Sequence, residues 1–138
     1  MNNQPCSPAT ESAGSDGRDP LAELFSRYKA TVTELDQAHE HRDSVAPPWP
    51  RISPEDLSDE LIAQIEADHL KIPAVVEAQA KMDAATVDRD SILEKMITTA
   101  AKSVRGLMAK AKAADDAPDN YAEAMRASWL RDAEALAA

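Results

Sequence analysis

The sequence contains very little of what many folds use for cross-links, turns and aromatic packing. It has one cysteine, Cys6, so no disulfide can form between its own residues, and we expect a reducing compartment, the cytoplasm. Only three glycines are present, which leaves few residues suited to β-hairpin turns. Aromatic residues make up 4% of the chain, so its core must come from Leu, Ile, Val, Met and closely packed Ala.

Long apolar runs and an excess of positive charge are also missing. The longest apolar runs extend over only a few residues, whereas a membrane-spanning helix needs about 20. The first residues have neither a basic start nor an apolar segment, so we expect no secretory signal. The formal net charge of −10 disfavours nonspecific binding to nucleic acid or anionic membranes. These absences predict a soluble cytoplasmic protein with no membrane partner.

What the sequence does have is apolar residues at helical spacing. Asp19 and Pro20 predict the start of a helix over residues 20–44, with Asp19 as its N-cap. At about 1.5 Å per residue this helix would be about 37 Å long, which is long for so small a domain. Its apolar side, mostly at steps of three or four residues, comprises Leu21, Leu24, Phe25, Tyr28, Val32, Leu35 and His39.

Proline and hydroxyl residues divide the remaining chain into four further predicted helices. A proline-rich connector over residues 46–54 ends the first helix, and Ser53 with Pro54 predicts the start of the second. A third helix is predicted over residues 74–98, with a kink or partial exposure in its polar middle at 83–90. Thr98, Thr99 and Ser103 compete as N-cap of the fourth helix, and the fifth covers residues 118–136.

The apolar residues of these helices predict their buried sides. No segment shows sustained β-branched alternation, so a sheet is not expected. We therefore predict an all-α fold: a disordered tail over residues 1–18, then a single helical domain over 19–138. In that domain the long first helix packs with an antiparallel C-terminal helical bundle. The predicted inward residues are Leu57, Leu61, Ile62, Ile65, His69 and Leu70, then Val76, Ala80, Met82, Val87, Ile92, Leu93, Met96 and Ile97, then Val104, Leu107, Met108 and Ala111, and finally Tyr121, Ala122, Met125, Trp129, Leu130, Ala133 and Leu136.

Two pairs of residues could bind a metal ion. Asp36 with His39, and Glu66 with His69, each place a carboxylate and an imidazole three residues apart, as in di-iron helical bundles. A complete site would also need bridging glutamates from two more helices, and nothing in the sequence fixes candidates at matched depth. The alternative is that both histidines border apolar stripes and their acidic neighbours are solvated. We predict no metal and no cofactor.

A basic cluster stands out in the otherwise acidic chain. It could attract an anionic partner, and Lys102, Arg105 and Lys112 are its candidates for a small nucleic-acid-associated regulator. Aromatic residues do not alternate with these cations, so the favoured interpretation is a solvated helix face or an intramolecular counterpart to the acidic helices. Trp49 in the connector could serve a proline-binding domain or fold back onto the core. The full cluster is Lys95, Lys102, Arg105, Lys110 and Lys112.

The segment Ile97–Lys110 resembles a group of short, uncharacterised all-helical proteins common in alphaproteobacteria and their prophages. The matching positions are Ser103, Val104, Gly106, Leu107 and Lys110. The Asp19-Pro20 opening and the closing segment from Trp129 to Leu136 also agree. Where those proteins usually carry Pro and Thr, this chain has Ala-Ala-Lys. The resemblance implies a helical fold and carries no established activity.

Gly106 is the one glycine inside a predicted helix. Because glycine costs about 1 kcal/mol there relative to alanine, we expect it to permit close packing against a neighbouring helix. The sequence contains no nucleophile, phosphate loop or paired-cysteine signature with supporting context. We therefore expect a non-enzymatic module that binds another protein, with its own dimer as one option.

Overall fold

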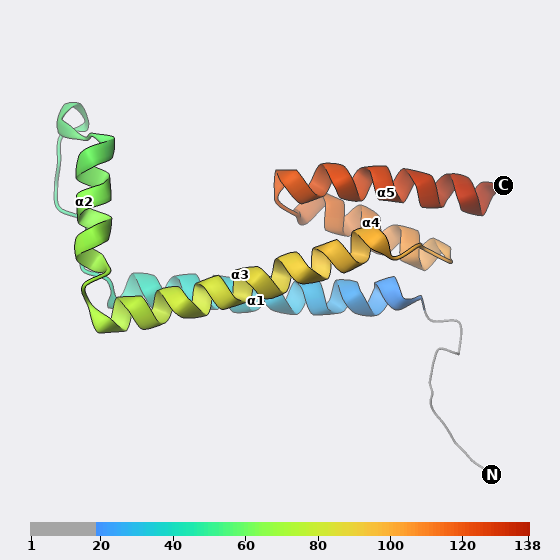
Figure 1. Ribbon diagram of the computed structural model, residues 1–138, viewed down its shortest axis with the longest axis horizontal. Helices are drawn as coiled ribbons and strands as arrows, with labels where there is room; N and C mark the ends of the chain where they lie inside the picture. Colours follow the sequence, from blue (N-terminus) through green and yellow to red (C-terminus); the bar gives the residue numbers. More distant parts are fainter. Residues whose placement is uncertain (1–18) are drawn as a thin grey trace, which may run out of the picture. The chain divides into compact units, whose positions relative to one another are not determined.

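The computed structural model describes residues 19–138 and contains only helical elements within that range (Figure 1). The all-α prediction is confirmed. The predicted disordered tail over residues 1–18, and with it Cys6, lies outside the described residues. The α-helices are α1 (Pro20–Val45), α2 (Asp59–His69), α3 (Pro73–Thr98), α4 (Val104–Asp116) and α5 (Asp119–Ala137), and Pro54–Asp56 forms a short 3₁₀ turn.

The start of α1 follows the predicted capping. The Leu21 amide donates to Asp19 Oδ1 at 3.0 Å, and the Ala22 amide donates to the Asp19 carbonyl at 3.0 Å. Asp19 therefore satisfies amide groups that have no partner within the helix. At the other end, the connector prolines stop α1 at Val45, as predicted.

The prediction for the start of the second helix is wrong. Ser53 makes no side-chain cap, and the turn Pro54–Asp56 ends at Leu57, whose backbone is extended (φ −79°, ψ 120°). The cap of α2 is Ser58, whose Oγ accepts a 3.1 Å bond from the Leu61 amide. Ser58 is followed by two acidic residues that favour the positive end of a helix, so the second capping sequence is the one that starts α2.

α3 begins at Pro73 and continues as one α-helix through residues 83–90, where a kink was one of two expectations. The other expectation, partial exposure, is confirmed: Asp83, Ala84, Val87 and Asp88 are exposed. The polar middle of the helix therefore reflects solvent contact and not a break in the hydrogen-bond ladder.

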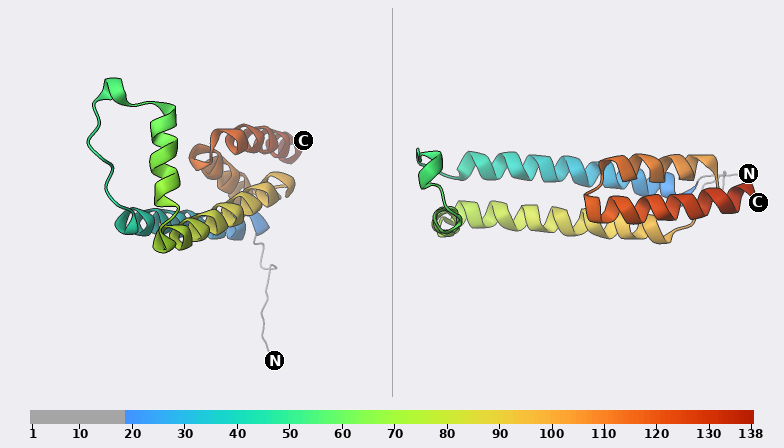
Figure 2. Two further views of the ribbon diagram at one scale, coloured as in Figure 1. Left: turned by 60° about the vertical axis from the view of Figure 1, so that its left-hand side comes forward. Right: turned by 90° about the horizontal axis from the view of Figure 1, so that it is seen from above.

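The described residues form two compact units, and the boundary between them falls inside α1 and inside α3. Unit 1 comprises residues 19–30 and Arg89–Ala138. Within it, α4 packs against α5, and the first part of α1 and the last part of α3 complete a set of four helical segments (Figure 2). Its buried residues include Leu21, Tyr28, Ile92, Leu93, Met96, Ala109, Ala113, Ala122 and Met125.

Unit 2 comprises residues 31–88, with the rest of α1, the connector, α2 and the first part of α3. Its buried residues include Ile65, His69, Val75, Ala78 and Ala85. The Trp49 ring lies edge-on to the His69 ring, with centroids 6.4 Å apart, so the connector does return to α2. Trp49 nevertheless stays half exposed.

Several predicted core positions are wrong. In α3 and α4 the buried side includes alanines such as Ala78, Ala109 and Ala113, while larger apolar residues such as Val76, Val104 and Met108 are exposed. His39, which was placed on the apolar side of the first helix, is exposed. The other exposed members of the predicted inward set are Leu57, Leu70, Val76, Ala80, Val87, Val104, Met108, Ala111, Leu130 and Leu136.

None of the helices in residues 19–138 combines the length and the apolar character needed to span a membrane.

Candidate functional site

The local structure around α4 begins with its cap. Ser103 has extended backbone (φ −157°, ψ 166°), and its Oγ accepts a 3.1 Å bond from the Gly106 amide. The two competing candidates instead complete α3: Thr98 Oγ1 donates to the Glu94 carbonyl, and Thr99 Oγ1 donates to the Lys95 carbonyl. Ser103 is thus the N-cap among the three predicted candidates.

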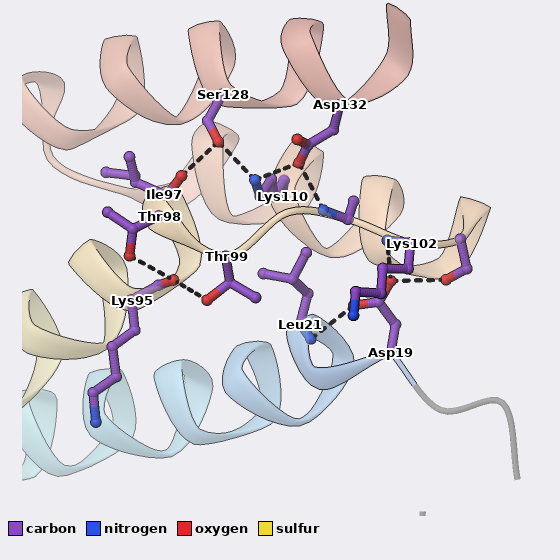
Figure 3. A network of polar contacts seen from close by, with 12 residues as sticks. Asp19, Leu21, Lys95, Ile97, Thr98, Thr99, Lys102, Lys110, Ser128 and Asp132 are labelled. Carbon is purple, nitrogen blue, oxygen red and sulfur yellow. Dashed lines mark hydrogen bonds and ion pairs between the residues drawn. The ribbon is translucent and has the colours of Figure 1, made fainter. Parts of the chain in front are cut away.

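The buried carboxylate of Asp19 serves the N-termini of two helices at once (Figure 3). While Oδ1 caps α1, Oδ2 accepts bonds from the Lys102 amide (2.8 Å) and the Ser103 hydroxyl (3.0 Å). Both helices present their positive ends to this negative charge, which is the favourable orientation. The contact between the start of α1 and the start of α4 is therefore electrostatic and directional.

Gly106 is required by this carboxylate. A Cβ at position 106 would lie 2.2 Å from Asp19 Oδ2 and 2.6 Å from Asp19 Cγ. The sequence predicted close packing at Gly106 against a neighbouring helix. The structure confirms the close approach, but the nearest atoms belong to the Asp19 side chain. Its carboxylate is held by three hydrogen bonds and so cannot easily move away.

Lys110 is the centre of a second polar network, and it is fully buried (0% exposed). Its Nζ donates to Ser128 Oγ at 2.6 Å and forms an ion pair with Asp132 Oδ2 (Figure 3). Ser128 Oγ donates in turn to the Ile97 carbonyl at 2.7 Å, and the Ala101 amide donates to Asp132 Oδ2 at 2.9 Å. The network joins the end of α3, the following loop, α4 and α5.

The basic cluster divides between the two interpretations that the sequence offered. Lys95, Lys102, Arg105 and Lys112 are exposed, as on a solvated helix face, whereas Lys110 is in the core and pairs with an acid of another helix. Burial acts to raise the pKa of Asp132, but the hydrogen bonds from Lys110 and Ala101 outweigh it, helped by the charge of Lys110, so the pKa is lowered. Asp132 thus stays ionised opposite the buried ammonium.

The C-terminal end of α4 is attached to α1 through Tyr28. Burial, together with the charge of Asp116 and its hydrogen bond to the phenol, raises the pKa of Tyr28 to about 12. Asp19 contacts the start of α4 and Tyr28 its end, so α4 runs along the first part of α1 in the same direction. Both ends of α4 are therefore fixed, which determines which of its sides faces solvent.

The solvent-facing side of α4 is apolar in its first part. Val104 is 71% exposed and Met108 is 52% exposed, although the sequence predicted both to be buried. At 100° per residue, Lys110 lies on the opposite side of the helix from these two. Arg105 and Lys112 flank them and are exposed as well.

A shallow groove borders this side of α4 on each flank. The groove toward α1, of ≈ 350 Å³, is lined by Phe25, Met108 and Lys112 among others. The groove toward α5, of ≈ 390 Å³, is lined by Ala111, Asp115, Arg126, Trp129 and Leu130 among others. We call the two grooves and the ridge between them the α4 surface, defined by Phe25, Val104, Met108, Ala111, Trp129 and Leu130 with Arg105, Lys112 and Arg126.

The predicted metal ligands are all in unit 2. Asp36, His39 and Glu66 are exposed on α1 and α2, while His69 is buried next to Trp49. Across residues 19–138, no group of three or more His, Cys, Asp or Glu side chains is arranged to hold a metal ion. The metal hypothesis rests on sequence spacing alone.

Unit 2 has a groove of its own, of ≈ 460 Å³, between α1 and α3. Its polar lining mixes both signs of charge, with Glu34 and Asp88 as acids and Lys81 as a base. The remaining lining includes Gln37, His41 and several alanines. This mixture favours no particular ligand chemistry.

The sequence missed the partners that build this site. Asp19 was predicted only as the cap of the first helix, and Asp132 was not singled out. A signal was present: Gly106, Ala109, Ala113 and Ala114 are small residues at helical spacing, and Lys110 lies among them. Small residues at that spacing mark the side where helices approach closely, so a lysine within it needs a buried counter-charge.

Three of the residues that carry the sequence resemblance now have a physical role. Ser103 caps α4, Gly106 makes room for Asp19, and Lys110 pairs with Asp132. These roles concern folding, so they say nothing about activity. No family model matches this chain, and no curated protein or solved structure is similar enough to count as a match.

Proposed function

We propose that this chain is a cytoplasmic, non-enzymatic module that binds a partner protein through the α4 surface. The observation that carries the proposal is that α4 buries Lys110 and leaves Val104 and Met108 in solvent. Burying an ammonium has a large desolvation cost, which Asp132 and Ser128 offset, whereas burying the two apolar side chains would favour folding. A cluster of exposed apolar residues with a polar rim is typical of an interaction site.

The grooves strengthen this interpretation. Each is open and mostly apolar, and the two adjoin one ridge, so a partner could insert side chains on both flanks of α4. The single cysteine of the sequence fits a reducing compartment. Catalysis would need convergent polar groups with a reacting atom between them, and the lining residues supply cations at the edge of an apolar surface instead.

Site-specific photo-crosslinking tests the proposal. A photoreactive amino acid is placed at position 104 or, as a matched control, at position 87, because Val87 is also well exposed (66%) but belongs to unit 2. In cells that express the protein, position 104 should capture a defined protein that position 87 does not. Capture at both positions, or at neither, would contradict the proposal.

A purified partner then allows a direct measurement. The double variant Val104→Ser with Met108→Ser should bind the captured protein at least about tenfold more weakly, because hydrophobic anchors at the centre of an interface are the ones that matter most. Val87→Ser should bind like the parent chain. Sedimentation equilibrium measures the self-association option, and a strict monomer at high micromolar concentration excludes it.

A further inference from the structure

The charges of the α4 surface identify the kind of partner. Arg105 and Lys112 lie on the α1 side of the ridge and Arg126 on the α5 side, against one acid, Asp115. The chain as a whole has 25 acidic and 15 basic residues, so the lining of the two grooves has the opposite sign of charge to the protein. Resting on the proposed function, we infer that the partner segment is an acidic amphipathic helix of another protein.

A second copy of this chain fits the surface poorly. If two copies met through the same surface, each would bring three cations and one acid to the interface. Like charges at an interface oppose association. The same-surface dimer is therefore disfavoured by charge, and an acidic helix that binds the α4 surface gains charge complementarity instead.

Nucleic acid fits it less well than an acidic helix. Phosphates would pair with Arg105 and Lys112, but contact with phosphate gives no gain from the exposed apolar side chains of Val104 and Met108. An acidic amphipathic helix uses both features, because its apolar side covers the ridge and its carboxylates reach the surrounding cations.

The dimensions of the surface set the length of the helix. Its apolar path crosses from Phe25 over Met108 and Ala111 to Leu130, and so touches three helices. Neighbouring helices lie about 8–10 Å apart, which makes the path about 20 Å long. A helix of about 13 residues covers that length at about 1.5 Å per residue. Its apolar residues would recur at steps of three and four, with Asp or Glu between them.

Selection from a peptide library tests this inference. The library consists of helical peptides of this length with apolar residues fixed at helical spacing, and the other positions are drawn equally from Glu, Lys and Gln. Selection against the full chain should enrich Glu at the variable positions. Selection against the double reversal Arg105→Glu with Lys112→Glu should enrich Lys instead.

The matched control is the reversal of two exposed cations in unit 2, Arg51→Glu with Lys81→Glu. It changes the net charge equally, so it should still select acidic peptides. Peptides selected against the parent chain should bind the Arg105/Lys112 reversal about fivefold to tenfold more weakly, since one exposed ion pair contributes up to about fivefold and reversal adds repulsion. Thermal melting followed by circular dichroism confirms that each variant is folded.

Each outcome decides a different statement. Basic or neutral peptides that depend on Val104 and Met108 would overturn the acidic partner and leave the α4 surface as a binding site. The inference is also wrong if no peptide is enriched, or if the enriched peptides bind equally well after the double substitution of Val104 and Met108 and after the double substitution of Arg105 and Lys112. The crosslink at position 104 separately decides the proposed function. If a labelled DNA duplex displaces the peptides and Val104→Ser leaves its affinity unchanged, the surface binds polyanions and the inference is wrong.

Discussion

The two sides of α4 differ in the opposite sense to an ordinary amphipathic helix, because a charged residue is buried and two large apolar residues are exposed. The inner side packs with Gly106, Ala109 and Ala113 and carries the charge of Lys110, while the outer side presents Val104 and Met108 to solvent. Hydrophobicity alone would have rotated the helix by about half a turn. What holds it in this orientation is a set of directional partners from other parts of the chain: Asp19 at its start, Asp132 at Lys110 and Tyr28 at its end.

The contrast shows how stability and binding can be assigned to opposite sides of one short helix. Small inner residues let α4 approach α5 and Asp19 closely, and the specific polar bonds then fix its rotation. The larger apolar residues are not needed for folding and remain available to a partner. Substitutions on the inner side should therefore change the free energy of unfolding, and those on the outer side should change binding.

The largest expected effect is on the inner side, from Asp132→Ala. Removing this carboxylate leaves the ammonium of Lys110 buried without its counter-charge, so we expect the free energy of unfolding to fall by about 3–5 kcal/mol. Urea denaturation followed by circular dichroism measures the loss.

Because that variant could fail to fold, a second one keeps the test decisive. The double substitution Lys110→Met with Asp132→Leu replaces the pair by apolar groups of similar size and should recover most of the lost stability. A double variant no more stable than Asp132→Ala would show that the pair is not what fixes the inner side.

The next largest effect is expected from Gly106→Ala, which should lower the free energy of unfolding by about 2 kcal/mol. The added Cβ would lie 2.2 Å from the bound Asp19 carboxylate. In an Asp19→Ala background that contact is gone, and the same substitution should stabilise α4 by up to about 1 kcal/mol, because alanine favours a helix over glycine.

The effect of Gly106→Ala on the free energy of unfolding should therefore have opposite signs in the parent chain and in the Asp19→Ala background. Urea denaturation of the parent chain, the two single variants and the double variant measures it. The same sign in both would mean that Asp19 is not the reason for the glycine. Gly106→Leu in the parent chain should lower the melting temperature and keep the helical circular dichroism signal.

A smaller effect should appear with acid. The pKa of Asp132 is lowered from 3.8 in the folded chain, so its contribution to stability is fully present above that value and is lost as pH falls through the lower, folded pKa. The stability difference between the parent chain and the Lys110→Met/Asp132→Leu variant should therefore shift in favour of the variant from about pH 5 to about pH 2. A difference that stays constant over this interval would contradict an ionised Asp132.

The smallest effect on stability is expected on the outer side. Val104→Ser with Met108→Ser should change the free energy of unfolding by no more than about 0.5 kcal/mol per substitution, as is usual for exposed positions. Urea denaturation of this variant and of Val87→Ser provides the comparison. A loss as large as that of Gly106→Ala would mean that both sides of α4 serve folding.

Local signals in the sequence predicted most of the helices, and their limits can be traced to particular residues. Asp19, Pro73 and the connector prolines act on the backbone within a few residues, so both ends of α1 and the start of α3 were predicted closely. The start of α2 was missed because Ser53 and Ser58 are both acceptable caps locally. The predicted metal pairs show the same limit, since spacing along a helix does not determine what another helix brings nearby.

The sequence by itself determined that this chain is helical and where most of its helices begin and end, because capping, proline and periodicity act over one or two turns. The tertiary structure alone decided how α4 is rotated, because that depends on Asp19 and Asp132, which lie 83 and 31 residues from their partners Lys102 and Ala101. A helix with apolar residues on one side and small residues on the other has two plausible inner faces. Only the counter-charge for Lys110 and the room beside Gly106 select between them.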